Sequence, residues 1–237
     1  MREDADVETS SDGYAQRFAG PLGAFLLEVQ ARLTLDLLSS WPAARILDVG
    51  GGHGQLTGPL VEAGYRVTVY GSSPACARRV GSWIAEGQAR FVAGDLLRAP
   101  FPDRAFDVVV SYRLLPHVAA WRQLVSELCR VARRAVLVDY PTARSVNAIS
   151  GATFGLKKRV EGNTRPFTVF RDGEVESAFA ASGFEPTARR PQFLFPMALH
   201  RALGWAGLAR VLEGGAAASG LTRLLGSPVI LRAERAS

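Results

Sequence analysis

The sequence predicts an α/β protein built on a doubly wound, mostly parallel sheet. Short apolar runs rich in β-branched residues alternate with segments of helical spacing through about the first 140 residues. Parallel strands need crossover helices, and right-handed crossovers place helices on both faces of the sheet. The chain has 237 residues, of which 48% are hydrophobic and 21% charged, enough for one large domain with a sizeable core.

The elements are expected in a regular order. Buried strands are predicted at 45–49, 66–70, 89–92, 105–111 and 135–140. Helices are predicted at 22–38, 54–63, 74–86 and 117–133, where apolar residues recur at about every third or fourth position. The later chain predicts a helix at 172–182, a strand at 187–194, helical spacing at 196–212, a small-residue loop at 214–220 and a strand at 228–233. We expect a single domain over 13–237, with helical cap elements from 13–40 and 142–170 and a pocket wall at 193–212.

The first twelve residues differ in composition from the remainder. They hold one arginine against five acidic residues, so we predict a disordered acidic tail over 1–12, not a secretory signal. No apolar run approaches the roughly 18 residues of a membrane span, and a cytoplasmic protein is expected. Cys76 and Cys129 have no metal or redox spacing and are expected to be free buried thiols.

The charge pattern argues against a nucleic-acid partner. The net charge is +6, but the basic residues are scattered and include only two lysines. The three histidines, His53, His117 and His200, have no ligand spacing, so no metal site is predicted.

The stretch RILDVGGGHGQLT, from Arg45 to Thr57, indicates a ligand-binding loop. A strand that enters a glycine-rich turn and then a helix presents backbone N–H groups to a ligand, and glycine permits close approach. Dinucleotide enzymes use G-x-G-x-x-G and a later acid, but Gln55 stands at the third glycine position. The stretch instead reads Asp48-x-Gly50-x-Gly52-x-Gly54.

This motif resembles the first motif of the class I S-adenosylmethionine-dependent methyltransferases, in the small-molecule branch similar to quinone-biosynthesis enzymes. Five later segments are also similar: 94–95, 101–118, 135–140, 170–185 and 227–235. The resemblance implies a seven-stranded Rossmann-like sheet, S-adenosyl-L-methionine as cofactor, and a small-molecule methyl acceptor. It implies cofactor contacts from Tyr14, Asp48, Gly50, Gly51, Gly52, Gly54, Gly71, Ser72, Asp95, Leu96 and Ser111.

One departure from the family concerns the end of the second strand. The family has an acid there that holds both ribose hydroxyls, but this sequence reads VTVYGSSP, with Gly71 at that place. Ser72 and Ser73 would supply weaker hydrogen bonds. The serines followed by Arg78 and Arg79 would also suit the 2′-phosphate of NADP, so an NADP-dependent oxidoreductase is an alternative. A non-catalytic nucleotide- or RNA-binding module is another.

Catalytic candidates follow from the carboxyl edge of the sheet. Methyl transfer needs alignment and exclusion of water, and a base only if the acceptor loses a proton. His117, Asp139 and Tyr140 are the candidates that follow strands at this edge. The apolar residues of 193–212 predict a hydrophobic acceptor and allow a peripheral membrane contact. The sequence does not indicate an oligomeric state.

Overall fold

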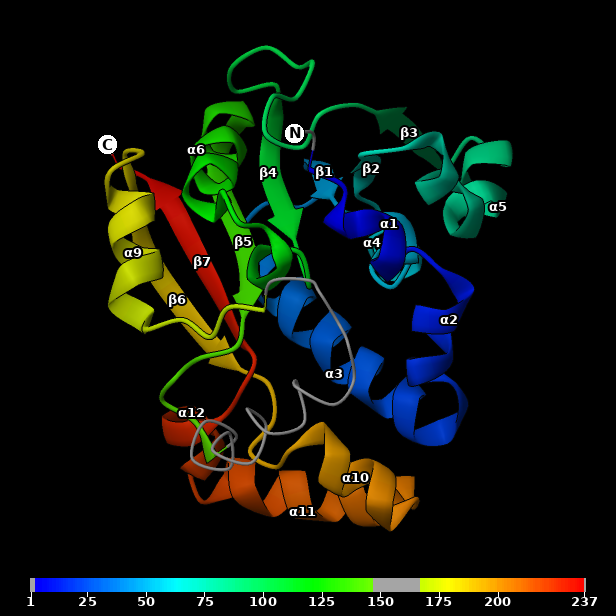
Figure 1. Ribbon diagram of the computed structural model, residues 1–237, viewed down its shortest axis with the longest axis vertical. Helices are drawn as coiled ribbons and strands as arrows, with labels where there is room; N and C mark the ends of the chain where they lie inside the picture. Colours follow the sequence, from blue (N-terminus) through cyan, green and yellow to red (C-terminus); the bar gives the residue numbers. More distant parts are fainter. Residues whose placement is uncertain (1–2, 147–166, 237) are drawn as a thin grey trace.

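The computed structural model describes residues 3–146 and 167–236, and its strands form one central sheet (Figure 1). In this described part the sheet has seven strands in the order β3-β2-β1-β4-β5-β7-β6. Their bounds are β1 (Arg45–Val49), β2 (Arg66–Gly71), β3 (Ala89–Ala93), β4 (Phe106–Ser111), β5 (Ala132–Tyr140), β6 (Phe184–Pro191) and β7 (Val229–Arg235). The first five pair in parallel, whereas β7 runs antiparallel to both β5 and β6. The predicted doubly wound, seven-stranded fold is confirmed.

Helices cover both faces of the sheet because alternate strand residues point in opposite directions. Leu47 and Val49 belong to the core under α6 (Trp121–Val131) and α9 (Asp172–Ala180). Ile46 belongs to the core on the other face, under α3 (Gly20–Leu38), α4 (Thr57–Glu62) and α5 (Gly81–Ala85). Each strand of the sheet's centre is therefore buried on both sides, as its continuous apolar run predicts.

A third, smaller core joins α3 to a helical layer at the base of Figure 1. This layer contains α10 (Met197–Leu203), α11 (Ala206–Ala218) and α12 (Leu221–Leu225). The predicted small-residue loop at 214–220 is wrong, because α11 continues through an alanine run to Ala218. Alanine has the highest helix propensity, which offsets the two glycines before it. Among the described residues, no helix combines the length and apolar character that crossing a membrane requires.

From residue 3 onward the acidic N-terminal segment is folded, which corrects the predicted disordered tail over 1–12 for its described part, residues 3–12. It forms α1 (Ala5–Thr9), α2 (Asp12–Ala15) and η1, a 3-10 helix (Gln16–Phe18). Its acids find partners in the protein: Asp6 is fully buried and accepts a hydrogen bond from the backbone of Ser72. Asp12 forms ion pairs with Arg78 at 2.6 Å and Arg79 at 3.1 Å. These contacts place α1 against the carboxyl edge of the sheet.

Some local boundaries also differ from the expected ones. The predicted helix at 74–86 is divided into a 3-10 helix, η3 (Pro74–Val80), and α5. Two further 3-10 helices, η2 (Gly51–His53) and η4 (Leu115–His117), follow β1 and β4. Of the predicted cap segment 142–170, residues 147–166 lie outside the described part. Its two described ends meet, since Thr142 and Phe170 form a parallel bridge.

Candidate functional site

The glycine loop after β1 has a backbone that requires glycine at two positions. Gly50 has φ +75° and Gly54 has φ +78°, a left-handed conformation that side chains disfavour. The Gly50 N–H donates to the carbonyl of Tyr70 at 2.8 Å, which fixes the loop on the neighbouring strand. A Cβ on Gly50 would stand 3.0 Å from a methyl group of Leu114. The loop is therefore held rigidly, with bare main chain at the edge of the sheet.

Asp48 ends β1 as a buried carboxylate with an unfilled acceptor. Its side chain is almost inaccessible to solvent, and its Oδ2 has no hydrogen-bond partner among the residues described. A Cβ on Gly51 would overlap this carboxylate, so the loop glycine leaves it room. Burial raises the pKa of Asp48 to about 7, because the charged form is poorly solvated there. A cationic or donor ligand would stabilise its ionised form.

The ends of β2 and β3 contribute main-chain and polar groups beside the loop. The Ser72 N–H points at the Asp6 carboxylate, 2.7 Å from Oδ2. The carbonyl of Asp95 accepts from the Tyr70 hydroxyl at 2.7 Å, and its Oδ1 accepts from the Leu97 N–H at 2.9 Å. These bonds fix the turn after β3, in which Leu96 is buried.

The N-terminal helices cover the glycine loop. A Cβ on Gly52 would overlap the Ser10 hydroxyl and the carbonyl of Cys76, so α1 and η3 both contact the loop there. Beside it, the rings of Tyr14 and Phe18 lie edge-on to His53, with centroids 5.5 and 5.6 Å away. Burial and the nearby arginines lower the pKa of His53 to about 4, so its ring is neutral at pH 7. Sequence reasoning anticipated Tyr14 and missed Ser10 and Phe18.

A half-buried arginine, also missed from the sequence, joins this cover to β5. Arg113 follows β4 with a left-handed φ of +57°, and its backbone N–H donates to Asp139 Oδ1 at 2.6 Å. Gln30 of α3 bridges the two side chains: its Oε1 accepts from Arg113 Nη2 and its Nε2 donates to Asp139 Oδ2, both at 3.2 Å. The guanidinium stacks 4.0 Å from the centre of the Phe18 ring, and within residues 3–146 and 167–236 its Nη1 has no hydrogen-bond partner. The only sequence clue is a cation directly after an apolar strand.

The catalytic candidates do not lie together. Asp139 belongs to the Arg113 network, and burial raises its pKa to about 6. Tyr140 points to the opposite face of the sheet, where its hydroxyl contacts Asp172 at 3.1 Å and burial raises its pKa. Both residues end β5 at the carboxyl edge of the sheet, but their side chains lie on opposite faces because successive strand residues alternate. His117 is half-buried in η4, with its ring 5.6 Å from that of Phe167.

Ser111, expected near the cofactor, directs its hydroxyl to the carbonyl of Val49 at 3.0 Å. It therefore ties β4 to the strand that carries the loop. Within the described ranges, no three His, Cys, Asp or Glu side chains are grouped to hold a metal ion.

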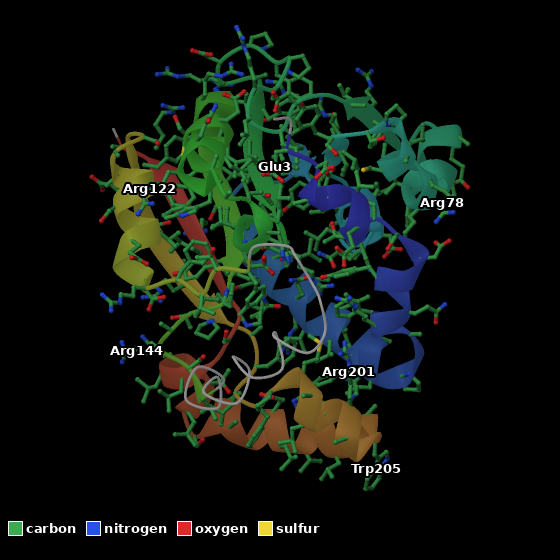
Figure 2. The ribbon with its side chains drawn as sticks, viewed as in Figure 1. Glu3, Arg78, Arg122, Arg144, Arg201 and Trp205 are labelled. Atoms are coloured by element: carbon green, nitrogen blue, oxygen red, sulfur yellow. The ribbon has the colours of Figure 1, made fainter. Side chains whose placement is uncertain are left out.

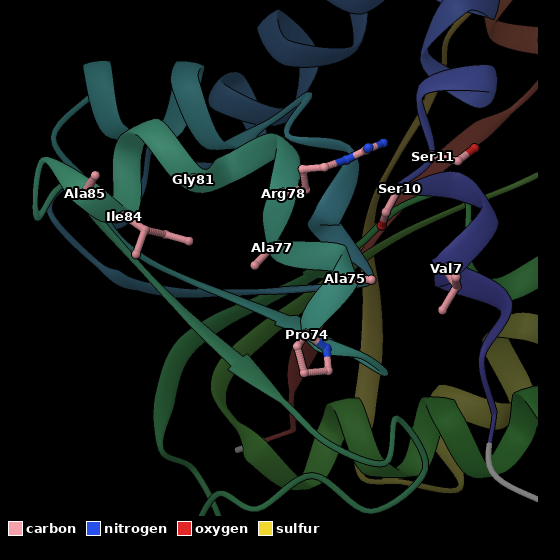
Figure 3. Close-up of a pocket in the computed structure, with 10 residues that line it drawn as sticks. All are labelled: Val7, Ser10, Ser11, Pro74, Ala75, Ala77, Arg78, Gly81, Ile84 and Ala85. Carbon is pink, nitrogen blue, oxygen red and sulfur yellow. The ribbon is translucent and has the colours of Figure 1, made fainter.

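A cavity of about 630 Å³ opens beside this site (Figure 3). Val7, Ser10 and Ser11 line one side of it, and residues of η3 and α5, among them Pro74 and Arg78, line the other. None of the loop glycines lines it. The groove over the glycine loop itself is thus covered by α1, and the open space lies on the outer side of that helix.

Comparison with known proteins agrees with this geometry. Residues 47–138 match the family described as a methyltransferase domain. A demethylmenaquinone methyltransferase of Beutenbergia cavernae is 35% identical over 119 residues, which are 47% of each chain. A ubiquinone biosynthesis O-methyltransferase of Rhizobium etli is 27% identical over 65% of this chain and 64% of its own. The chain spans about half the length of the first of these relatives.

The fold is also found in solved structures. Magnesium protoporphyrin IX methyltransferase of Synechocystis, solved with SAH bound, superposes with a TM-score of 0.66 at 16% identity and covers 96% of both chains. Sheet order, glycine loop and matched domain agree with one another. Residues 47–138 are therefore similar to a methyltransferase domain, and this matched part includes the loop after β1.

Proposed function

We propose that this chain transfers a methyl group from S-adenosylmethionine to a small, apolar acceptor. The observation that carries the proposal is the buried Asp48 carboxylate beside bare main chain at the carboxyl edge of the sheet. Open parallel sheets bind their ligands at this edge. When bound, S-adenosylmethionine supplies a methyl group attached to a positively charged sulfur.

The residues of the loop fit such a cofactor. Asp48 would hold a cationic part, and a nearby positive charge would lower its raised pKa and keep it ionised. Gly50 and Gly52 carry no side chain, so a ligand can approach the main chain closely there. The remaining proposed contacts are those of Tyr14, Gly51, Gly54, Gly71, Ser72, Asp95, Leu96 and Ser111.

The cover of the loop supports an apolar acceptor. Tyr14, Phe18 and His53 present three rings, and the His53 ring is neutral. Such a surface excludes water and suits a flat, weakly polar molecule, which favours methyl transfer by alignment. Arg113 adds one buried cationic nitrogen without a partner. An acceptor oxygen that gains negative charge would be stabilised there.

His117 would act as the general base for acceptors that lose a proton. Both Asp139 oxygens accept hydrogen bonds, so this side chain holds Arg113 and Gln30 in place. His117 is the remaining candidate base for acceptors that lose a proton. We expect His117→Asn to lower kcat for such acceptors and to leave affinity for S-adenosylhomocysteine unchanged. Equal loss of both would assign His117 to folding or binding instead.

The segment 193–212 supports a pocket wall. Phe193 packs against Phe25 of α3 with ring centroids 6.3 Å apart, while Trp205 is 67% exposed at the end of the layer (Figure 2). A peripheral membrane contact through this end stays a prediction. Sedimentation with vesicles of anionic and neutral lipid, compared between the wild type and Trp205→Ser, tests it.

The charges near η3 weigh against the NADP alternative. Arg78 and Arg79 both pair with Asp12, and the carboxylate of Asp6 lies next to Ser72. A 2′-phosphate would meet that negative charge. Titration calorimetry with S-adenosylhomocysteine and with NADP separates the two: we expect heat only from the first. Binding of NADP alone would overturn the proposal.

The acceptor class needs a second experiment. The protein is incubated with methyl-labelled S-adenosylmethionine and a panel of quinols, phenols and polar amines, and labelled products are identified by mass spectrometry. We expect label in the apolar quinols or phenols. Label confined to the polar amines would refute the apolar acceptor and leave the methyl transfer intact.

A further inference from the structure

A carboxylate stands at the end of β2 although β2 itself provides none. We propose that Asp6 of α1 holds the ribose hydroxyls of the cofactor, in place of the acid absent at Gly71. The inference rests on the proposed function, since it concerns the same cofactor. It assigns a binding role to the acidic segment that precedes the methyltransferase domain.

The position of the Asp6 side chain is the first observation that supports a contact with the ribose. Its Oδ2 accepts hydrogen bonds from the Ser72 N–H at 2.7 Å and from the Cys76 thiol at 3.4 Å. The same oxygen is 3.1 Å from the point where a Cβ on Gly71 would stand. An acidic side chain at 71 would enter this space. Asp6 therefore brings its carboxylate to the same end of β2 from a different element of the fold.

The second observation is that the Asp6 carboxylate can accept further hydrogen bonds. The side chain is fully buried, and its Oδ1 has no hydrogen-bond partner in the part of the chain that the structure describes. A buried carboxylate oxygen without a donor is costly, and native proteins rarely keep one without a use. Two adjacent hydroxyl groups are two donors, which is what a carboxylate with an open oxygen can accept.

The third observation concerns the contacts that hold α1 in place beside the end of β2. The Asp6 carbonyl accepts from the Ser10 hydroxyl at 2.7 Å and from the Thr9 hydroxyl at 3.1 Å, so this short helix is stiffened around Asp6. The chain then continues to Asp12, which is paired with two arginines of η3. The segment is thus tied to the residues that follow β2, and Asp6 lies where the two meet.

A chemical double-mutant cycle tests the contact. Calorimetry on the full chain measures the affinity for S-adenosylhomocysteine and for its 2′-deoxy and 3′-deoxy analogues, in the wild type and in Asp6→Asn. Asparagine keeps one oxygen for the Ser72 N–H and loses the second acceptor. Asp4→Asn is the matched control: it removes the same charge from an exposed residue two positions away.

We expect wild-type affinity to fall by about tenfold to a hundredfold when either hydroxyl is removed. In Asp6→Asn the parent compound should bind that much more weakly, and the deoxy analogues should lose little more. Asp4→Asn should behave as the wild type. The comparison of the three ligands in the wild type does not depend on the folding of any variant. Far-ultraviolet circular dichroism shows whether Asp6→Asn folds.

Three results would overturn the inference. Equal weakening of all three ligands in Asp6→Asn would make Asp6 a support of the loop. Tighter binding by Asp6→Asn would show that α1 blocks the site. A wild type indifferent to both deoxy changes would remove the ribose contact altogether. If the wild type binds no S-adenosylhomocysteine, the proposed function fails before Asp6 is tested.

Discussion

Replacing Asp48 with asparagine should stabilise the ligand-free protein at high pH while it removes cofactor binding. The carboxylate is buried, has an unpartnered Oδ2 and lies against the glycine loop. Asparagine has nearly the same shape and does not ionise. The variant therefore isolates the cost of keeping a charge in this place.

The magnitude follows from the pKa. Burial raises the pKa of Asp48 from its ordinary 3.8 to about 7. The folded state then binds more protons than the unfolded state between these values, so stability falls as the pH rises through this window. At about 1.4 kcal/mol per pKa unit, the penalty is on the order of 2 kcal/mol at pH 5 and about 4 kcal/mol at pH 8. The free energy of unfolding of Asp48→Asn, relative to that of the wild type, should therefore rise by about 2 kcal/mol between pH 5 and pH 8.

Urea unfolding of both proteins at pH 5 and pH 8, without ligand, measures this difference. In thermal unfolding the advantage of Asp48→Asn should grow by about 4–8 °C between the two pH values. Asp4→Asn is the control, because its carboxylate is exposed. An Asp48→Asn advantage that is the same at both pH values, or a loss of stability at pH 8, would show that the carboxylate is well satisfied in the ligand-free state.

Other residues of the site give further tests. Gly50→Ala and Gly64→Ala should each cost about 1 kcal/mol in urea unfolding, because φ is +75° and +83°, but only Gly50→Ala should weaken S-adenosylhomocysteine in calorimetry. Equal binding by both variants would contradict the loop assignment. Arg113→Met should destabilise the fold by about 3 kcal/mol at pH 8. The loss should be smaller at pH 5, because the pKa of Asp139 is raised to about 6 and its carboxylate becomes neutral there. A loss of stability that is the same at both pH values would show that Arg113 does not stabilise the charge of Asp139. Since burial lowers the pKa of His53 to about 4, wild-type stability should decline from pH 6.5 to pH 4, and His53→Phe should reduce that decline in parallel denaturation curves.

Much of the fold follows from local sequence patterns. The strand from Arg45 to Val49 is a buried apolar run closed by glycines, and it occurs with those bounds. Boundaries shift where propensity and tertiary pairing compete: β6 begins at Phe184, because the chain pairs with β7 from that residue. The alanine-rich end of α11 shows the opposite case, in which helix propensity outweighs two glycines.

The site was predicted less completely because its second half comes from distant contacts. Asp48 and the loop glycines follow from one motif in the sequence. Asp6 meets Ser72 across 66 positions, and Gln30 meets Asp139 across 109. The spacing of apolar residues along the chain does not indicate contacts between residues so far apart in sequence. A net-acidic segment indicates disorder only while its charges have no partners. Here Asp12 pairs with Arg78 and Arg79, which the NADP alternative placed beside a 2′-phosphate.

Among the described residues, several of the buried polar atoms without hydrogen-bond partners lie around the glycine loop. They include Asp6 Oδ1, Asp48 Oδ2, both ring nitrogens of His53 and Arg113 Nη1. Each such atom lowers stability, so together they reduce the stability of the ligand-free edge of the sheet. A ligand that donates to the two carboxylates removes that cost as it binds. Cofactor affinity and the instability of the empty loop are therefore two measurements of the same unpaired groups, and substitutions that stabilise the loop without ligand should weaken the cofactor.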